Sequence, residues 1–236
     1  MHKIDIPDWA VAHVTTKRGK SHIFEDLDPR TTALLVVDLQ KGYMMEDVAH
    51  NLIETAPEIV PNVNRIAAAL RAAGGLVVWI KNTVCPDSLV SWSVFHQAMS
   101  TAEGRDRRIA SMTAGAIGHQ LWPELDVLAC DEIVEKTRFS AFIQGASGLE
   151  ATLRGRGVDT VIITGTVTNV CCESTARDAM MRNFKTLMIS DANAARSDAE
   201  HNAALTAFYV TFGDVMTTDE VIHCIGGATS LKAAAG

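Results

Sequence analysis

Long apolar runs and a surplus of positive charge are both missing from this 236-residue sequence. No run approaches the roughly 20 apolar residues that cross a bilayer, and the N-terminus MHKIDIPDWAVAHVTTKRGKSH lacks the apolar segment of a signal peptide. Lys and Arg number 21 against 28 Asp and Glu, for a net charge of −7. Because nucleic acids and anionic membranes attract clustered basic residues, we expect no nucleic-acid partner and no membrane partner.

Cysteine is also scarce, and its spacing argues against the common structural uses. The sequence has no Cys-x-x-Cys pair and no cysteine–histidine spacing typical of a zinc site. An odd, scattered set in a long chain is typical of free thiols in a reducing compartment, so we expect a cytoplasmic location. Two of the cysteines are adjacent, but a disulfide between neighbours would strain its ring. The five are Cys85, Cys130, Cys171, Cys172 and Cys224.

The sequence does contain a regular alternation of strand and helix patterns. The run ALLVVDLQ, from Ala33 to Gln40, is apolar without alternating, as in a parallel strand covered on both faces. Between most of the later apolar runs lies a segment whose apolar residues recur at helical spacing. This alternation predicts an α/β fold with a parallel, doubly wound sheet. The other expected strands are 76–80, 131–136, 160–164, 186–190 and a short one within 214–218.

One domain is expected, spanning residues 31–228. Residues 1–30 are polar and mixed, which indicates an N-terminal arm, and 229–236 are expected to be a frayed tail. Residues 82–130 are less regular and are interpreted as an excursion over the sheet. This length is ordinary for a single α/β domain.

Three residues with complementary chemistry follow three of the expected strands: Asp38, Lys136 and Cys171. In a doubly wound sheet the ligand site lies beyond the carboxyl ends of the strands, so we expect the three to meet there. A helix N-terminus and a nearby ammonium both favour the thiolate form of a cysteine. A nearby carboxylate can take the thiol proton and return it to a leaving nitrogen. The set therefore permits nucleophilic catalysis without a histidine.

Each of these residues alone also has an ordinary structural interpretation. A single cysteine after a strand is commonly a small buried hydrophobic residue. A single lysine there is commonly a solvated charge, and a single aspartate commonly caps a turn or a helix. Their convergence on one predicted sheet edge favours the catalytic interpretation.

Three segments around these residues resemble the signature segments of the isochorismatase-like cysteine hydrolases. They are ALLVVDLQKGY, EKTRFSAF and TGTVTNVCCESTARDA, in the family's order and spacing, and the match extends from Ala33 to Ile225. The resemblance implies a three-layer α/β/α sandwich with a six-stranded, mostly parallel, doubly wound sheet. It also implies a catalytic triad of Asp38, Lys136 and Cys171.

The same resemblance has consequences for the backbone around the nucleophile. It implies a cis peptide bond between Thr166 and Val167, and an oxyanion hole made by the backbone N–H groups of Val167 and Cys171. Such donors contribute roughly 3–4 kcal/mol each in comparable hydrolases. Cys172 shares a helical stripe with Ala176 and is expected to pack against the sheet, with a resolving role in redox chemistry as the alternative.

Within the family, the closer resemblance is to the ureidoacrylate amidohydrolase and N-carbamoyl amidase branch. Nicotinamidases carry a metal-binding Asp and histidines after the second strand, whereas KNTVCPDSLVSW follows it here. His50, His96 and His119 are scattered and are interpreted as surface or loop residues, so we expect no catalytic metal and no cofactor. The residues expected to line a pocket for a small planar amide are Gln40, Tyr43, Trp79, Asn82, Phe139 and Phe142, although Trp79 also suits a core position.

Two polar residues near the triad have more specific expected contacts. If strand geometry continues past Asp38, then Gln40 points to the same side and orients the Asp38 carboxylate. Arg138 is expected to pair with Glu135 or Asp131, and binding of a substrate carboxylate is the alternative.

Together these features predict a cysteine-dependent amidohydrolase that cleaves a carboxamide or ureido C–N bond through a thioester. One alternative is the vinyl-ether hydrolysis of isochorismatase itself, and another is a catalytically silent binding domain of the same fold. The family resemblance also implies a homodimer or homotetramer, in which the N-terminal arm or the 82–130 excursion reaches a neighbour's site.

Overall fold

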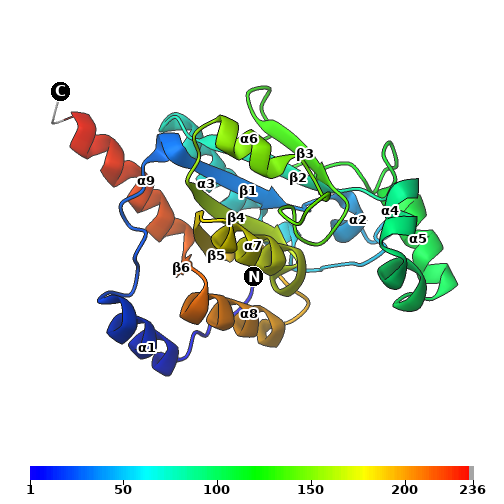
Figure 1. Ribbon diagram of the computed structural model, residues 1–236, viewed down its shortest axis with the longest axis horizontal. Coiled ribbons are helices and arrows are strands. Elements are labelled where there is room, and N and C mark those ends of the chain that lie inside the picture. Colours follow the sequence, from blue (N-terminus) through cyan, green and yellow to red (C-terminus); the bar gives the residue numbers. More distant parts are fainter. Residues whose placement is uncertain (234–236) are drawn as a thin grey trace.

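Six parallel strands form a single sheet at the centre of the molecule (Figure 1). The computed structural model describes residues 1–233 of the chain. The strand order is β3-β2-β1-β4-β5-β6, and every neighbouring pair is parallel, so the predicted doubly wound α/β sheet is confirmed. The strands are β1 Thr32–Val37, β2 Leu76–Asn82, β3 Glu132–Lys136, β4 Thr160–Thr166, β5 Lys185–Ala194 and β6 Asp214–Met216.

Helices cover both faces of this sheet and complete the three layers (Figure 1). The helices are α1 Asp8–Arg18, α2 Lys41–Met44, α3 Val60–Ala72, α4 Pro86–Ser91, α5 Ala102–Met112, α6 Leu149–Gly155, α7 Glu173–Met181, α8 Asp198–Thr211 and α9 Thr218–Ala233. Helices α3 and α9 pack on one face, whereas α6, α7 and α8 pack on the other. There are also two π-helical turns in the described residues. Val94–Ala98 lies between α4 and α5, and Thr168–Cys172 connects β4 to α7.

The central strand β1 explains why the sequence pattern identified the sheet. All six of its residues are buried. Leu34 and Val36 point into the core beneath α3 and α9, while Leu35 and Val37 point into the core beneath α6, α7 and α8. A strand that is covered on both faces needs apolar residues at every position, which is the continuous run seen in the sequence.

Both ends of the chain contain a helix. Within the expected N-terminal arm, α1 packs against α8 through the buried side chains of Ala10 and Val14. Arg18 anchors the end of α1 by donating hydrogen bonds to the carbonyl oxygens of Gly213 (2.9 Å) and Tyr209 (2.8 Å). Helix α9 continues through the expected boundary at residue 228 to Ala233, and residues 234–236 of the predicted tail lie outside the described residues.

Helices α4 and α5 of the excursion between β2 and β3 lie beyond the carboxyl ends of the strands, at the right of Figure 1, whereas its last residues return along α3, where Leu125 is buried in the core. The excursion contains α4, the turn Val94–Ala98 and α5. Helix α5 is polar and has Ser111 and Met112 as its buried residues, both at its C-terminal end. A helix without a long apolar stripe has little to bury against a sheet face, so it remains at the edge.

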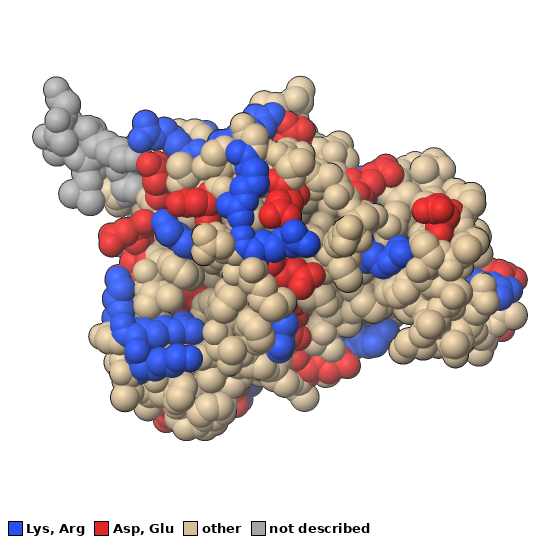
Figure 2. All heavy atoms as spheres, viewed as in Figure 1, with Lys and Arg blue, Asp and Glu red and all other residues tan. Residues whose placement is uncertain are grey.

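Charged side chains of both signs are distributed over the surface. On the face shown in Figure 2, Lys and Arg gather over α1 at the lower left, and elsewhere they are interspersed with Asp and Glu. Among the described helices, none combines the length and the apolar character needed to cross a membrane.

Candidate active site

The carboxyl ends of four neighbouring strands, β3, β2, β1 and β4, lie together where the strand order reverses. Val37, the last residue of β1, pairs with Ile80 on β2 and with Gly165 on β4. Asn82, at the end of β2, pairs with Lys136 at the end of β3. The chain leaves β1 toward β2 on one side and reaches β4 on the other, and such a reversal opens a crevice at the strand ends.

A buried ion pair occupies this edge of the sheet. The Lys136 Nζ donates a hydrogen bond to Asp38 Oδ2 at 2.7 Å, and both side chains are fully buried. The same Nζ donates to the carbonyl oxygen of Arg138 at 3.0 Å, which directs the lysine toward Asp38. The other carboxylate oxygen, Asp38 Oδ1, has no hydrogen-bond partner within residues 1–233 and is therefore a buried, available acceptor.

The backbone of Asp38 turns its side chain away from the regular strand. Its φ angle is +55°, in the left-handed region that aspartate tolerates better than most residues. Its N–H donates to the carbonyl oxygen of Ile80 at 2.9 Å, which continues the pairing with β2 for one residue beyond β1. This single residue ends the alternation of the strand.

Cys171 lies in the π-helical turn Thr168–Cys172 between β4 and α7. Its side chain is 4% exposed, close enough to Asp38 and Lys136 for both charges to act on it, and it lines a cavity. Cys172 is fully buried in the core with Ala176. The two adjacent cysteines thus face different surroundings, and Cys171 is the one at the cavity.

The segment before the nucleophile is held by its own backbone. The peptide bond between Thr166 and Val167 is cis. The N–H groups of Val170 (3.0 Å) and Cys172 (3.2 Å) donate to the carbonyl oxygen of Val167. Gly165, with a φ of +118°, passes so close to the backbone of Val37 that a Cβ atom would overlap the carbonyl oxygen of that residue. Only glycine fits there.

Burial dominates the electrostatics of the three residues. It raises the pKa of the Cys171 thiol above its ordinary value, against the opposing charge of Lys136. It also raises the pKa of Asp38, again opposed by Lys136. Burial alone would lower the pKa of Lys136, but the negative charges of Asp38 and Cys171 outweigh it and the pKa is raised. The thiol of Cys171, with its raised pKa, therefore stands beside a buried ion pair that can take up its proton.

A cavity of about 270 Å³ opens outward from Cys171. One side comes from the strand ends and from the segment after β1, and the other side comes from the excursion. The lining residues are Tyr43, His50, Asn51, Asn82, Thr83, Val84, Trp92, Phe95, His96, Arg108, Thr137, Phe139, Val167, Val170, Cys171 and Arg196.

Three of the six predicted pocket residues line this cavity: Tyr43, Asn82 and Phe139. Asn82 Nδ2 donates a hydrogen bond to Tyr43 Oη at 2.8 Å, so these two side chains form one polar unit. Phe139 meets Trp92 edge-on, with 4.8 Å between the ring centroids. A planar ligand would therefore meet both a polar and an aromatic wall.

The other three predicted pocket residues lie elsewhere. Gln40 does not reach the Asp38 carboxylate; its amide bonds to backbone groups of Asn82 and His119, because the left-handed residue 38 breaks the strand alternation. Trp79 is a core residue whose Nε1 donates to Asp131 at 2.8 Å. Phe142 packs in the core near Phe184, with 5.4 Å between ring centroids.

The expected pairing of Arg138 is also wrong. Asp131 is already bound by Arg71 at 2.7 Å, and Glu135 lies 3.8 Å from Lys81. Arg138 donates instead to the carbonyl oxygen of Thr137 at 2.9 Å and lies over the ring of Trp92. It supports the aromatic wall from outside the cavity.

The histidines are less exposed than predicted. His96 and His119 are buried, and His50 and His96 line the cavity. Burial, with a further contribution from Arg108, lowers the pKa of His50 to about 4. Among the residues that the structure describes, no group of three or more His, Cys, Asp or Glu side chains could hold a metal ion.

Several cavity residues were missed from the sequence: Trp92, Phe95, His96, Arg108 and Arg196. Four of them come from the excursion. The cluster WSVFH, residues 92–96, was a usable signal, because aromatic residues inside an otherwise polar segment need a partner surface.

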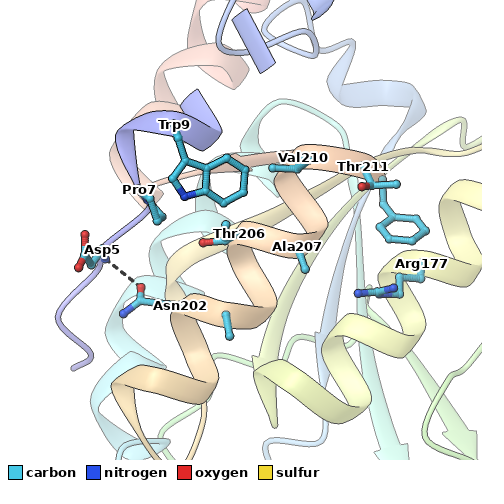
Figure 3. A pocket seen from close by; sticks show the side chains of 11 residues that line it. Asp5, Pro7, Trp9, Arg177, Asn202, Thr206, Ala207, Val210 and Thr211 are labelled. Atoms are coloured by element: carbon cyan, nitrogen blue, oxygen red, sulfur yellow. Dashed lines mark hydrogen bonds between the residues drawn. The ribbon is translucent and has the colours of Figure 1, made fainter. Parts of the chain in front are cut away.

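A second, larger hollow of about 630 Å³ lies at the surface between the N-terminal segment, α7 and α8. Figure 3 shows Trp9 lying across α8 near Val210, with Arg177 of α7 at the opposite end. Asp38, Lys136 and Cys171 do not line it. The smaller cavity at the sheet edge is therefore the candidate active site.

Comparisons with known proteins identify the family of this chain. Residues 32–220 match the isochorismatase domain. A ureidoacrylate amidohydrolase from Variovorax paradoxus is 33% identical over 213 residues, covering 84% of this chain and 83% of that protein. One from Pseudomonas savastanoi pv. phaseolicola is 31% identical, covering 92% and 91%.

Solved structures of cysteine hydrolases and amidases are also similar to this chain. A cysteine hydrolase from Pseudomonas syringae pv. phaseolicola is 32% identical with a TM-score of 0.73, covering 86% of this chain and 96% of that one. An N-carbamoylsarcosine amidase from Thermoplasma acidophilum is 26% identical with a TM-score of 0.63, covering 80% and 97%.

Proposed function

Because this chain belongs to the isochorismatase family, we propose that it is a cysteine-dependent amidohydrolase, which cleaves a carboxamide or ureido C–N bond of a small substrate. The observation that carries the proposal is a thiol on a cavity wall backed by a fully buried Asp38–Lys136 ion pair. The names of the relatives, ureidoacrylate amidohydrolase and N-carbamoylsarcosine amidase, support a C–N bond as the target.

In the first step, the Cys171 sulfur attacks the substrate carbonyl carbon while Asp38 accepts the thiol proton. The unpartnered Oδ1 is the acceptor, and the raised pKa of Asp38 makes its carboxylate a stronger base than an exposed one. Lys136 stays protonated throughout and balances the charge that Asp38 and the sulfur share. The backbone N–H groups of Val167 and Cys171 stabilise the oxyanion of the tetrahedral intermediate.

In the second step, the C–N bond breaks and the leaving nitrogen takes the proton from Asp38. Ammonia or an amine departs, and the acyl group remains on Cys171 as a thioester. A water molecule then gives a proton to Asp38 and attacks the thioester carbonyl. The C–S bond breaks, the acid product leaves, and Asp38 returns the proton to sulfur.

The two alternative functions have less support. Vinyl-ether hydrolysis does not need a thiol, whereas here the thiol faces the cavity and the proton acceptor lies beside it. A silent binding domain has no use for a buried ion pair, because such pairs contribute little net stability.

The direct test is ammonia release from a panel of ureido acids, N-carbamoyl amino acids, maleamate and nicotinamide. Cys171→Ala is compared with Cys172→Ala, a neighbour that is buried but faces away from the cavity. We expect turnover to depend on Cys171 alone, and mass spectrometry of the wild type during turnover to show a thioester on the peptide that contains it. Turnover that survives Cys171→Ala would refute the proposal.

A further inference from the structure

A histidine of α8 is bonded to the turn Thr168–Cys172, which carries Cys171. His201 Nε2 lies 2.9 Å from the Ser190 carbonyl oxygen, and His201 Nδ1 lies 2.9 Å from Thr168 Oγ1. Because a carbonyl oxygen can only accept, Nε2 donates, and the other nitrogen of the neutral ring accepts from the Thr168 hydroxyl. The ring therefore connects β5 to the first residue of the turn.

The surroundings of His201 keep this ring neutral. The side chain is fully buried, and burial, with a smaller contribution from the neighbouring His2, lowers the pKa of His201 to about 4. At neutral pH the Nδ1 atom is therefore an acceptor. Val167, which precedes the turn, has no polar side-chain atom with which to cap it. Without the Thr168 hydroxyl, Nδ1 would be buried without its donor, and the turn would lose this attachment.

A second histidine, from the N-terminal segment, lies against the first. The ring of His2 stacks on that of His201, with 4.4 Å between centroids and 21° between planes. The His2 side chain is 2% exposed. The N–H of Ala195 donates to His2 Nε2 at 2.9 Å, so this nitrogen carries no proton, and Nδ1 donates to Asp198 Oδ1 at 2.8 Å. His2 therefore covers one face of His201 and is itself fixed at both nitrogens.

The backbone around His2 is also tied to α8. Asn202 Nδ2 donates to the carbonyl oxygen of Lys3 at 2.9 Å, and Asn202 Oδ1 accepts from the N–H of Asp5 at 2.9 Å. The second of these bonds is the dashed line in Figure 3. Asn202 directly follows His201 in α8. The residue that holds the N-terminal segment is thus adjacent to the one on which His2 stacks.

We propose that His201 and His2 are positioning residues for the nucleophile. His201 fixes the Thr168 hydroxyl, and with it the turn that presents Cys171, whereas His2 holds the His201 ring in the orientation that accepts. Neither histidine is among the residues that line the cavity. This inference rests on the proposed function and adds to it a contribution from the N-terminal segment. A shift of the turn by about 1 Å is enough to matter, because misplacement on that scale can reduce a rate on the order of 100-fold.

The Thr168 hydroxyl is the contact to test first. Thr168→Val has nearly the same shape but no donor, so we expect kcat for ammonia release to fall about 100-fold, with KM within about threefold of wild type. Thr168→Ser keeps the hydroxyl and should retain kcat within about threefold. Urea unfolding measures the stability of each variant. A contact that serves stability alone would lower the free energy of unfolding and leave kcat of the folded protein unchanged.

The contribution of His2 is tested with a matched histidine. His2→Ala should lower kcat about tenfold, because the His201 ring is then free to turn away from Thr168. His13→Ala is the control, since His13 is an exposed residue of α1 in the same N-terminal region. The double variant Thr168→Val/His2→Ala should be no slower than Thr168→Val, because His2 acts through the same bond. Losses that multiply in the double variant would refute the role of His2.

Alkylation separates this inference from the proposed function, because it needs no substrate. Mass spectrometry measures the rate at which iodoacetamide labels each cysteine. We expect Thr168→Val to slow the labelling of Cys171 about tenfold, because its proton is less well placed for transfer to Asp38, and to leave the exposed Cys130 unchanged.

The outcomes of the two assays differ for the two ideas. If wild type releases no ammonia but Thr168→Val still slows the labelling of Cys171, the hydrolase is refuted and the positioning role is supported. The positioning role is refuted if Thr168→Val keeps both kcat and the labelling rate of Cys171 within about threefold of wild type. It is also refuted by equal losses in Thr168→Val and Thr168→Ser, since the hydroxyl would then not be the cause.

Discussion

The inner end of the cavity and its outer wall are built in different ways. The inner end consists of Asp38, Lys136 and Cys171, which come from the ends of β1, β3 and β4 and are buried in or against the sheet. The outer wall comes largely from the excursion, whose short helices and π-helical turn leave residues such as Trp92 and Arg108 partly exposed. Under the proposed function, the sheet would position the reacting groups, and the excursion would form the wall that contacts the rest of the substrate.

The inner end of the cavity contains two buried charges, and their desolvation opposes folding. Removing two charges from water costs several kcal/mol per ion, and the mutual attraction of the pair only roughly repays this. The Asp38–Lys136 pair is fully buried, so stability alone does not explain it. The outer wall makes few such demands, so it can change at lower cost to the fold.

The largest expected effect is at the nucleophile. Cys171→Ala should reduce kcat by at least about 10⁴-fold, because no other group can form the thioester. Cys172→Ala should keep kcat within about threefold and destabilise the fold by about 1 kcal/mol, as for a small cavity in the core. Single-turnover kinetics and urea unfolding measure the two effects. The reverse ranking would show that the wrong cysteine has been assigned.

The ion pair should link activity to stability. Lys136→Met leaves the Asp38 carboxylate buried without its partner, so we expect a loss of about 3–5 kcal/mol in the free energy of unfolding and about 10³-fold in kcat. The double variant Asp38→Asn/Lys136→Met removes both charges and should recover most of the stability but none of the activity. If the double variant is no more stable than Lys136→Met, the pair is not the source of the cost.

The next largest effect is a pH dependence of the free energy of unfolding, which comes from a buried histidine beside the nucleophile turn. His201 is fully buried; its Nε2 donates to the Ser190 carbonyl oxygen at 2.9 Å, and its Nδ1 accepts from Thr168 Oγ1, next to the nucleophile turn, at 2.9 Å. Burial lowers the pKa of His201 to about 4. Between pH 6.5 and 4 the unfolded chain binds a proton that the folded chain does not, so the stability contribution is present above pH 6.5 and lost as the pH falls.

The difference in proton affinity corresponds to about 3.5 kcal/mol at about 1.4 kcal/mol per tenfold change. Urea unfolding between pH 4 and 7 measures it. His201→Asn should reduce the dependence without abolishing it, because the pKa of His50 is also lowered to about 4 by burial. His96→Asn in the outer wall should change the dependence less. Equal slopes for wild type and His201→Asn would contradict this account.

The smallest effect is expected in the aromatic wall. Trp92 stacks on Phe95 with 4.2 Å between centroids and meets Phe139 edge-on. Aromatic contacts of this kind contribute about 0.5–1.5 kcal/mol, so Trp92→Leu should raise KM by about three- to tenfold. Steady-state kinetics should show kcat within about twofold of wild type. A large fall in kcat with KM unchanged would mean that the wall takes part in the chemistry.

The sequence-based predictions were right for the strands and their ends and less reliable for single side chains of the cavity. The strands and the meeting of Asp38, Lys136 and Cys171 were predictable, since buried parallel strands are continuous apolar runs and their carboxyl ends share one edge. The role of Gln40 was not, because it depends on a single left-handed residue at position 38. Trp79 was ambiguous because a strand covered on both faces loses the alternation that marks its sides.

By itself the sequence determined the order of strands and helices, and with it which strand ends carry an acid, a base and a thiol, because these depend on local patterns along the chain. Only the tertiary structure decided that burial outweighs the lysine charge at Cys171 and that Arg108, Phe95 and His96 face the same cavity as the nucleophile. Burial and convergence depend on contacts between segments far apart in the sequence, and these contacts exist only once the chain has folded.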